Sequence, residues 1–213
     1  MIALKKFLSF IFLFLITVTY ASEGYQCNFL DLENHWSSPY ANYCFEKGYI
    51  KGTGPATFSP DLSVTRAMLI TALGRYADAD ISSYKTSTFP DSNINTYYGP
   101  YIEWAKSHSI IKGYPDGTIK PNQTVSRAEM ATIVSNFLEF STHQEVNSSC
   151  ENFSDDAKIP AWAKDCVYKV SSLGIITGFN NDHGLAGRFF DPSGQALRSY
   201  LVAIIYRMDT LLD

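Results

Sequence analysis

The feature that most constrains how this chain can fold is a unit that occurs three times. Each copy opens with a phenylalanine and, two residues later, an aspartate: Phe29-Leu-Asp31, Phe89-Pro-Asp91 and Phe153-Ser-Asp155. An aromatic residue follows in each copy, with a second residue four positions after it: Trp36 and Tyr40, Tyr97 and Tyr101, Trp162 and Cys166. Because residues four apart lie on one face of a helix, this spacing predicts an amphipathic helix near the start of each copy.

Each of these helices is predicted to end at a short segment that contains glycine. The three segments are Gly48-Tyr-Ile-Lys-Gly52, Ser109-Ile-Ile-Lys-Gly113 and Gly174-Ile-Ile-Thr-Gly178. Gly48 and Gly174 suit the left-handed position that follows a helix, because glycine adopts it at no steric cost. Ser109 takes this position in the second copy, so we expect a weaker helix end there.

A loop rich in turn residues separates the two helices of each copy. It contains Phe58-Ser-Pro-Asp61, Tyr114-Pro-Asp-Gly117 or Phe190-Asp-Pro-Ser-Gly194. The distance from the second glycine of the preceding segment to the arginine that opens the next helix is 14 residues in two copies and 20 in the third. The third copy therefore has a six-residue insertion, which we place in the loop around residues 180–184.

The second helix of each copy begins at an arginine: Arg66, Arg127 and Arg198. A cation in the first turn is unusual, because the helix dipole favours a negative charge there. In the middle copy, Ser126 and Glu129 predict a capping box. Apolar residues then recur with helical period in all three copies, and these are predicted to form the core.

Helix pairs of this size cannot bury their apolar faces alone, so the three copies are expected to pack into one body. The sequence predicts an all-α fold of three helix-loop-helix repeats around a pseudo-threefold axis. We place the repeats at residues 22–80, 81–145 and 146–213.

Residues 1–21 have the features of a secretory signal peptide. Lys5 and Lys6 precede an apolar run, and small residues up to Ala21 fit a cleavage site. An uncleaved membrane anchor is the alternative, although a membrane span needs about 20 apolar residues. We expect no membrane span after signal cleavage.

The charge of the remaining chain argues against binding to nucleic acid. Residues 1–21 contain two lysines and no acidic residue, so the rest has 15 basic and 21 acidic residues and a formal charge of −6. Binding to nucleic acid or to an anionic membrane would need a broad basic face. An anionic partner would therefore have to be bound at a local site.

The chain contains four cysteines, an even number that predicts two disulfides in an exported protein. The sequence leaves the connectivity open, but the spacing favours Cys27 with Cys44 and Cys150 with Cys166. A zinc site is the alternative; it normally has closely paired CxxC ligands, which the sequence lacks. We predict no metal site and no cofactor.

Taken together, these motifs resemble the S-layer homology repeat, whose signature at the second helix is Thr-Arg-Ala-Glu. The resemblance extends from Phe29 to about Met208 and rests on the same order and spacing in three copies. Two copies depart from the signature: Met68 replaces the glutamate in the first, and the third reads Leu-Arg-Ser-Tyr. We therefore expect unequal binding grooves, with those bordered by the second copy the most capable.

The resemblance implies a module that binds secondary polysaccharides attached to bacterial peptidoglycan, often through pyruvylated sugars, in grooves between repeats. It implies that the motif arginines contact the acidic sugar, and we include the motif glutamate with them: Arg66, Arg127, Arg198 and Glu129. Residues of the turn that could border the groove are expected to contribute as well: Gly52, Gly113, Gly178, Lys51 and Lys112.

The residues themselves leave two interpretations of the arginines open. Unpaired N–H groups at a helix N-terminus and an adjacent guanidinium would together bind a carboxylate. Alternatively, each arginine pairs internally with an aspartate of a repeat, which would fasten loop to helix: Asp31, Asp91 or Asp155. We interpret the three aromatics as core packing residues, with sugar platforms as the alternative: Trp36, Tyr97 and Trp162.

The function we predict is an exported, non-catalytic module at the cell surface, in the wall or in the periplasm, with cell-wall polysaccharide as its partner. The alternative is a structural envelope protein that contacts other envelope proteins without bound carbohydrate. We do not expect an enzyme, because a wall hydrolase needs paired carboxylates or a nucleophile with a base, and no such arrangement can be nominated.

Overall fold

The computed structural model describes residues 29–142, 152–180 and 187–212. The predicted signal peptide, Cys27, Cys150 and most of the predicted insertion lie outside these residues. The helices are α1 (Ser38–Glu46), α2 (Arg66–Tyr76), α3 (Gly99–Ser107), α4 (Arg127–Thr142), α5 (Ala161–Ser172) and α6 (Arg198–Leu212), with short 3-10 turns at Leu30–Leu32 and Asp156–Lys158. Two short strands, β1 (Phe179–Asn180) and β2 (Arg188–Phe189), pair antiparallel in the third repeat. Apart from this hairpin the described chain has the predicted helical architecture.

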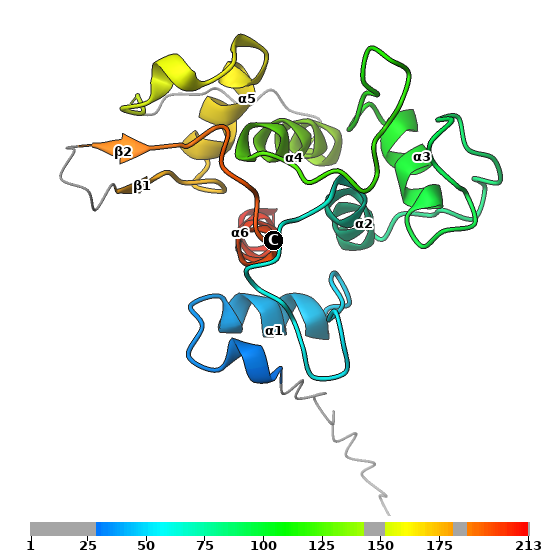
Figure 1. Cartoon of the computed structure of the whole chain (residues 1–213), viewed down its shortest axis with the longest axis horizontal. Helices are drawn as coiled ribbons and strands as arrows, with labels where there is room; N and C mark the ends of the chain where they lie inside the picture. Colours follow the sequence, from blue (N-terminus) through cyan, green and yellow to red (C-terminus); the bar gives the residue numbers. More distant parts are fainter. Residues whose placement is uncertain (1–28, 143–151, 181–186, 213) are drawn as a thin grey trace, which may run out of the picture.

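The three arginine-initiated helices lie at the centre of the molecule, and the other three helices lie around them (Figure 1). The outer helix α1 packs against α6, α3 against α2, and α5 against α4. Each outer helix therefore packs on the inner helix of the preceding repeat, and the first repeat packs on the third. The predicted repeats are present, but the helix pairs form between repeats rather than within them.

A triangle of backbone hydrogen bonds joins the three repeats where the inner helices begin. The N–H of Val64 donates to the carbonyl of Ala196 at 2.7 Å, that of Ala196 to Val125 at 3.1 Å, and that of Val125 to Val64 at 2.9 Å. All three side chains are buried. One such bond per repeat, closing on itself, agrees with the predicted pseudo-threefold arrangement.

Neighbouring repeats also supply carbonyls to the first N–H groups of the inner helices. In α2, the N–H of Arg66 donates to Gln123 and that of Ala67 to Pro121, both at 2.9 Å. The corresponding groups of α4 and α6 donate to carbonyls at Gly194, Pro192, Leu62 and Pro60. The interpretation that unpaired N–H groups await an anion at these helix starts is therefore wrong, because the adjacent loop already satisfies them.

Local capping signals are confirmed. The N–H of Ser126 donates to the Glu129 carboxylate at 2.8 Å, and the N–H of Glu129 donates to the Ser126 hydroxyl at 3.2 Å. These two bonds form the predicted capping box of α4. Gly48 and Gly174 have φ of 77° and 70°, and Ser109 adopts the same left-handed region with φ of 59°.

The structure does not support the two predicted disulfides. Cys44 and Cys166 are free cysteines, and their predicted partners lie outside the described residues. The two thiols also occupy different places in their repeats, eight residues after Trp36 and four residues after Trp162. Cys44 is fully buried between α1 and α6, where burial, together with the nearby Asp209 carboxylate, raises the pKa of its thiol to about 12. The predicted pairings treated Cys44 and Cys166 as equivalent positions, but Cys44 is buried and Cys166 is only partly buried.

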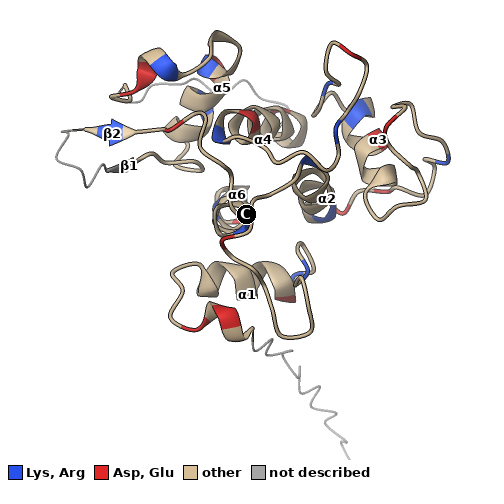
Figure 2. Ribbon diagram, viewed as in Figure 1, with Lys and Arg blue, Asp and Glu red and all other residues tan. Residues whose placement is uncertain are grey.

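The described residues also bear on the expectations about a membrane span and a metal site. None of their helices is both long and apolar enough to cross a membrane. Likewise, residues 29–142, 152–180 and 187–212 contain no group of three or more potential metal ligands. Figure 2 shows acidic and basic residues interspersed over the repeats.

Candidate ligand-binding grooves

Three grooves occupy corresponding positions in the described structure, and each takes its name here from one motif arginine. The Arg66 groove is lined by Arg66, Lys112, Gly113, Tyr114, Glu129 and Trp162, among others. The Arg127 groove is lined by Arg127, Gly178, Phe179, Tyr200, Arg207 and Trp36. The Arg198 groove is lined by Arg198, Lys51, Gly52, Met68, Arg75 and Tyr97.

Every groove contains residues from all three repeats. In the Arg66 groove, the arginine comes from the first repeat, the turn at Gly113 and the inner helix α4 from the second, and Trp162 from the third. The other two grooves follow the same scheme with the repeats shifted by one. Each of the nine predicted ligand-binding residues lines one of the three grooves. The cyclic packing of the helices brings these residues together from different repeats.

The aromatic residues at the outer helices face these grooves. Trp36, Tyr97 and Trp162 are 50%, 57% and 59% exposed, and each lines one groove. Our interpretation of them as core packing residues was wrong. They lie at or just before the start of the outer helices, so their rings extend over the neighbouring repeat at the edge of the groove instead of into the core.

The motif arginines are buried and make the same contact in each repeat. Each donates a hydrogen bond from Nε to a loop carbonyl of the following repeat: Arg66 to Ile119 at 2.8 Å, Arg127 to Phe190 at 2.7 Å, and Arg198 to Phe58 at 2.9 Å. The exposed fractions are 5%, 7% and 4%. A cation is thus tolerated at the helix start because it contacts the negative end of a neighbouring peptide group.

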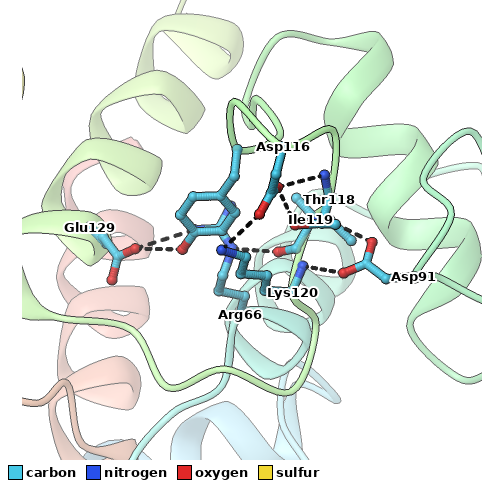
Figure 3. Close-up of polar contacts among 8 residues, drawn as sticks. Arg66, Asp91, Asp116, Thr118, Ile119, Lys120 and Glu129 are labelled. Atoms are coloured by element: carbon cyan, nitrogen blue, oxygen red, sulfur yellow. Dashed lines mark hydrogen bonds and ion pairs between the residues drawn. The ribbon is translucent and has the colours of Figure 1, made fainter.

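The motif aspartates hold the same loop residues from the other side. The Asp91 carboxylate accepts from the N–H groups of Ile119 and Lys120 at 2.9 and 2.7 Å, beside the bond from Arg66 (Figure 3). Asp31 and Asp155 accept equivalent bonds at residues 58–59 and 190–191. Arginine and aspartate therefore clamp one loop residue between them, and no direct ion pair joins them among the described residues.

The loop bonds also affect the acidity of Asp31. Burial acts to raise its pKa, but hydrogen bonds from the backbone N–H groups of Phe58 and Ser59 outweigh this effect and hold the pKa below its usual value. The charged form of the aspartate is therefore the one that the loop stabilises.

The remaining nitrogen atoms of the three guanidinium groups have different partners. Nη1 of Arg66 lies 3.8 Å from the Glu129 carboxylate, which also accepts a 2.7 Å bond from the Tyr114 hydroxyl (Figure 3). Nη2 of Arg198 donates to the carbonyl of Lys51 at 2.8 Å. Nη2 of Arg127 is buried and has no hydrogen-bond partner in the described chain. Of the three motif arginines, only Arg66 has a carboxylate of the described residues within ion-pair distance.

Aromatic rings surround each guanidinium. Arg66 lies 4.8 Å from the ring centroid of Tyr114, and Arg198 lies 4.5 Å from that of Phe58. Arg127 contacts three rings, at 5.2 Å from Phe179, 5.0 Å from Phe190 and 5.4 Å from Tyr200. Burial lowers the pKa of Arg127 and lowers that of Arg198 to about 10, so Arg198 remains a cation at neutral pH.

The groove glycines have a packing role. A Cβ atom on Gly52, Gly113 or Gly178 would lie 2.5–2.6 Å from the ring of the phenylalanine that opens the same repeat. Any larger residue would displace that ring, which anchors the start of the repeat. The side chains of Lys51 and Lys112, in contrast, are exposed at the groove edge.

The charged residues that line the grooves differ in number and sign. The Arg198 groove contains three cations, Lys51, Arg75 and Arg198, and no carboxylate among its lining residues. The Arg127 groove contains Arg127 and Arg207. The Arg66 groove contains Arg66 and Lys112 together with Glu129. The expectation that the second copy forms the most capable grooves stays a prediction, but electrostatics favour an anion most in the Arg198 groove.

Sequence reasoning missed Arg75 and Arg207. They lie seven residues after Met68 and Tyr200, and these residues line the same grooves. Residues seven apart share a helix face, so the pattern was present in the sequence. It was overlooked because the groove-facing side of each inner helix could not be identified without its partner helix.

Three helical repeats that close into a ring, with an arginine-containing groove at each boundary, define a class of repeat module. A family model described as the S-layer homology domain matches residues 28–67, 88–131 and 152–198. The chain therefore belongs to the S-layer homology domain family.

Relatives of this chain include proteins of the bacterial surface. Cell surface glycoprotein 1 of Acetivibrio thermocellus is 33% identical over 168 residues, which cover 76% of this chain and 7% of that protein. An amylopullulanase of Thermoanaerobacterium thermosulfurigenes is 30% identical over 189 residues, 88% of this chain and 10% of the enzyme. A cellulosome-anchoring protein of Acetivibrio thermocellus is 28% identical over 161 residues, 73% of this chain and 34% of that protein. The chain thus matches only a minor part of each relative.

Proposed function

We propose that this protein is a non-catalytic module of the bacterial cell envelope that binds peptidoglycan-linked secondary polysaccharide. The ligand is an acidic or pyruvylated sugar, and its carboxylate is bound in the grooves between repeats. Catalysis is not part of this function. The module is exported by the predicted signal peptide and acts at the cell surface.

The observation that carries this proposal is the occurrence of three corresponding grooves with a buried, immobilised guanidinium in each. A cation that the fold has already desolvated and oriented loses little further freedom when it binds an anion. Each groove also has a half-exposed aromatic ring at its edge, where a sugar can place its apolar face. The same chemistry is thus offered at three places on one rigid body.

The family and its named members support the location. Membership in the S-layer homology family, and relatives named for the cell surface and for cellulosome anchoring, favour attachment to the wall. The repeat limits 22–80, 81–145 and 146–213 belong to the proposal.

One specific observation favours the alternative of a structural envelope protein without bound sugar. The Nε atoms of all three arginines already donate to loop carbonyls, so stabilisation of the fold is by itself a sufficient role for the arginines. A binding test that removes an arginine would therefore confuse loss of ligand contacts with loss of stability. Exposed cations at the groove edge provide a better test.

The experiment compares two double variants with the same change in net charge. Lys51→Ala/Lys112→Ala removes a cation from each of two grooves, and Lys85→Ala/Lys158→Ala removes two exposed cations that line none of the three. The mature chain from Ser22 is mixed with isolated bacterial wall sacculi, and the sedimented fraction is measured against protein concentration at low and high salt. Melting temperatures establish that each variant is folded.

We expect wild type to sediment and the groove variant to bind about tenfold more weakly, the effect of losing charge-assisted contacts. The control variant should remain within about twofold of wild type. Equal weakening of both variants would point to non-specific charge attraction. Failure of folded wild type to sediment with any sacculi would reject the proposal and leave the structural alternative.

A further inference from the structure

The Arg127 groove differs from the other two in having an unsatisfied donor at its inner end. Nη2 of Arg127 is buried without a hydrogen-bond partner in the described chain, although the residue is only 7% exposed. Leaving a charged donor unpaired away from water costs free energy. The rings of Phe179, Phe190 and Tyr200 surround the guanidinium, and Arg127 lines the groove.

This groove is too small to contain a polymer segment. It encloses about 190 Å³, compared with about 710 Å³ for the Arg66 groove. Pockets that hold a drug-sized ligand enclose about 300–1,000 Å³. A terminal acidic group fits into the Arg127 groove, and the sugars attached to it have to leave across the rim.

The rim leads onto a row of aromatic rings in the seam between α1 and α6, which we call the aromatic strip: Trp36, Tyr40, Tyr43, Tyr200 and Tyr206. Trp36 and Tyr200 line the groove itself, with ring centroids 5.9 Å apart. Tyr40 continues from Trp36 at 6.2 Å, Tyr206 follows at 5.1 Å, and Tyr43 at 5.0 Å. Trp36 is half exposed and the four tyrosines are partly exposed, and the pairs Trp36–Tyr40, Tyr40–Tyr206 and Tyr43–Tyr206 meet edge to face.

The other two seams lack such a strip. Tyr206 lies eight residues after its motif arginine, and the corresponding residues are Gly74 in α2 and Ser135 in α4, both buried. Tyr40 corresponds to Tyr101 in the second repeat and to Cys166 in the third. The inner helices α2 and α4 therefore carry a small residue where α6 carries a tyrosine. At Gly74 the Tyr101 ring fills the space, 2.4 Å from where a Cβ would lie.

Hydrogen bonds fix the far end of the strip. The Tyr43 hydroxyl donates to the carboxylate of Asp209, which is only 8% exposed, and the Tyr49 hydroxyl donates to the same carboxylate at 3.5 Å. Immobilised rings lose little entropy when a ligand stacks on them. Tyrosine also combines an apolar ring face with a polar edge, which matches the apolar face and hydroxyl rim of a sugar.

We propose that the Arg127 groove binds the acidic terminal sugar of an oligosaccharide whose following sugars stack along the aromatic strip. This inference rests on the proposed function. It adds the direction in which the bound oligosaccharide runs and the number of its sugars that contact the protein. One groove of the three binds several consecutive sugars outside its own volume, along a row of rings, whereas a ligand of the other two is bound within the groove. Affinity at this groove therefore increases with the length of the sugar chain.

The three tryptophans allow the grooves to be observed separately by NMR. The indole N–H of Trp36 reports on the Arg127 groove and that of Trp162 on the Arg66 groove, while Trp104 is 4% exposed and serves as an internal control. The probe is polysaccharide released from sacculi that sediment the protein, under conditions that keep acid-labile ketals intact, and fractionated from one to about six sugars. Wild type is compared with Tyr206→Ser, which introduces the residue found at this position in α4.

We expect affinity measured at Trp36 to rise about tenfold from the shortest to the longest fraction, and affinity at Trp162 to change by less than about twofold. Tyr206→Ser should abolish the increase at Trp36 while it leaves binding of the shortest fraction and the melting temperature close to wild type. Tyr40→Ala provides a second variant with the same expected effect.

A length dependence that is equal at both indoles, or that survives in both variants, would overturn the inference while sedimentation still supports the proposed function. Absence of sedimentation would instead reject the proposed function itself. Oligoglutamates of graded length are the competing probe. If they bind at Trp36 with the same length dependence and more tightly than the sugars, the strip is a site for an acidic peptide and the inference is wrong.

Discussion

The Arg66 and Arg198 grooves have the same framework and differ in the chemistry that they offer to a ligand. In both, the arginine donates from Nε to a loop carbonyl at 2.8–2.9 Å, and the same ring of backbone bonds holds the helix start. In the Arg66 groove a carboxylate, Glu129, lies 3.8 Å from the guanidinium, whereas Met68 takes that place in the Arg198 groove. The shared contacts belong to the fold, so differences in function have to come from residues that the fold leaves free to vary.

Substitution of the motif arginines is expected to have the largest effect on stability. Arg198→Ala loses two hydrogen bonds to backbone carbonyls, one buried and one part-buried, so we expect a loss of about 3 kcal/mol in unfolding free energy and a fall in melting temperature of about 6–12 °C. Arg127→Ala loses one such bond together with an unpaired charge, and about half this effect is expected. Thermal and urea unfolding measure both. Equal losses would mean that the Nη contacts add nothing to stability.

Substitution of the turn glycines Gly178 and Gly113 by alanine is expected to reduce stability by different amounts. A Cβ on Gly178 would lie 2.5 Å from the carbonyl oxygen of Phe189, and backbone cannot move aside as readily as a ring. Gly178→Ala should therefore cost about 2–3 kcal/mol. On Gly113 the nearest atom, at 2.6 Å, belongs to the Phe89 ring, so we expect about 1–2 kcal/mol there.

Gly54→Ala is the control for these two substitutions, because its nearest neighbour lies at 3.6 Å. Its unfolding free energy should stay within about 0.5 kcal/mol of wild type. If Gly113→Ala were as harmless as this control, the close packing of the Phe89 ring against the turn would not be a constraint on the repeat.

Glu129→Gln removes the main electrostatic difference between the two grooves. The amide keeps an oxygen that can accept from Ser126 or Tyr114, but it no longer neutralises Arg66. Affinity for a carboxylated monosaccharide such as glucuronic acid, followed at the Trp162 indole, should rise severalfold and at most about tenfold. Met68→Glu should have the opposite effect in the Arg198 groove. Weaker binding in Glu129→Gln would instead assign Glu129 a direct role in holding the sugar.

The smallest expected effect concerns the ends of the outer helices. Ser109 has φ of 59°, where a residue with a side chain is strained, so Ser109→Gly should stabilise the protein by about 0.5–1 kcal/mol. The reciprocal change Gly174→Ser, at φ of 70° with no neighbour within 4 Å of the new Cβ, should destabilise it by a similar amount. Urea unfolding distinguishes the two, and changes of the same sign would show that helix-end geometry is not the cause.

The sequence predicted the parts of this molecule that depend on local spacing. The helix starts at the motif arginines, the capping box at Ser126 and Glu129, and the left-handed residues at helix ends all follow from short-range chemistry. The nine candidate binding residues were chosen by resemblance, and the structure brings each of them to a groove.

The pairing of helices was not predictable in the same way. Because the three repeats are alike, an outer helix has an equivalent apolar partner in its own repeat and in the preceding one, and sequence periodicity does not choose between them. The exposure of Trp36, Tyr97 and Trp162 depends on that choice. So do the groove positions of Arg75 and Arg207, which explains why these features were misjudged or overlooked together.

The pairing of α1 with α6 has a consequence for how the chain reaches its native state. The Cys44 thiol donates to the carbonyl of Val202, a residue 158 positions later in the chain. During synthesis or translocation, α1 therefore emerges well before the helix that covers its apolar face. The ring can close only after α6 has arrived, so the slow, long-range step of folding comes last. A chain that cannot complete its fold until its third repeat is present is well suited to pass through a secretion channel unfolded and to fold only after translocation.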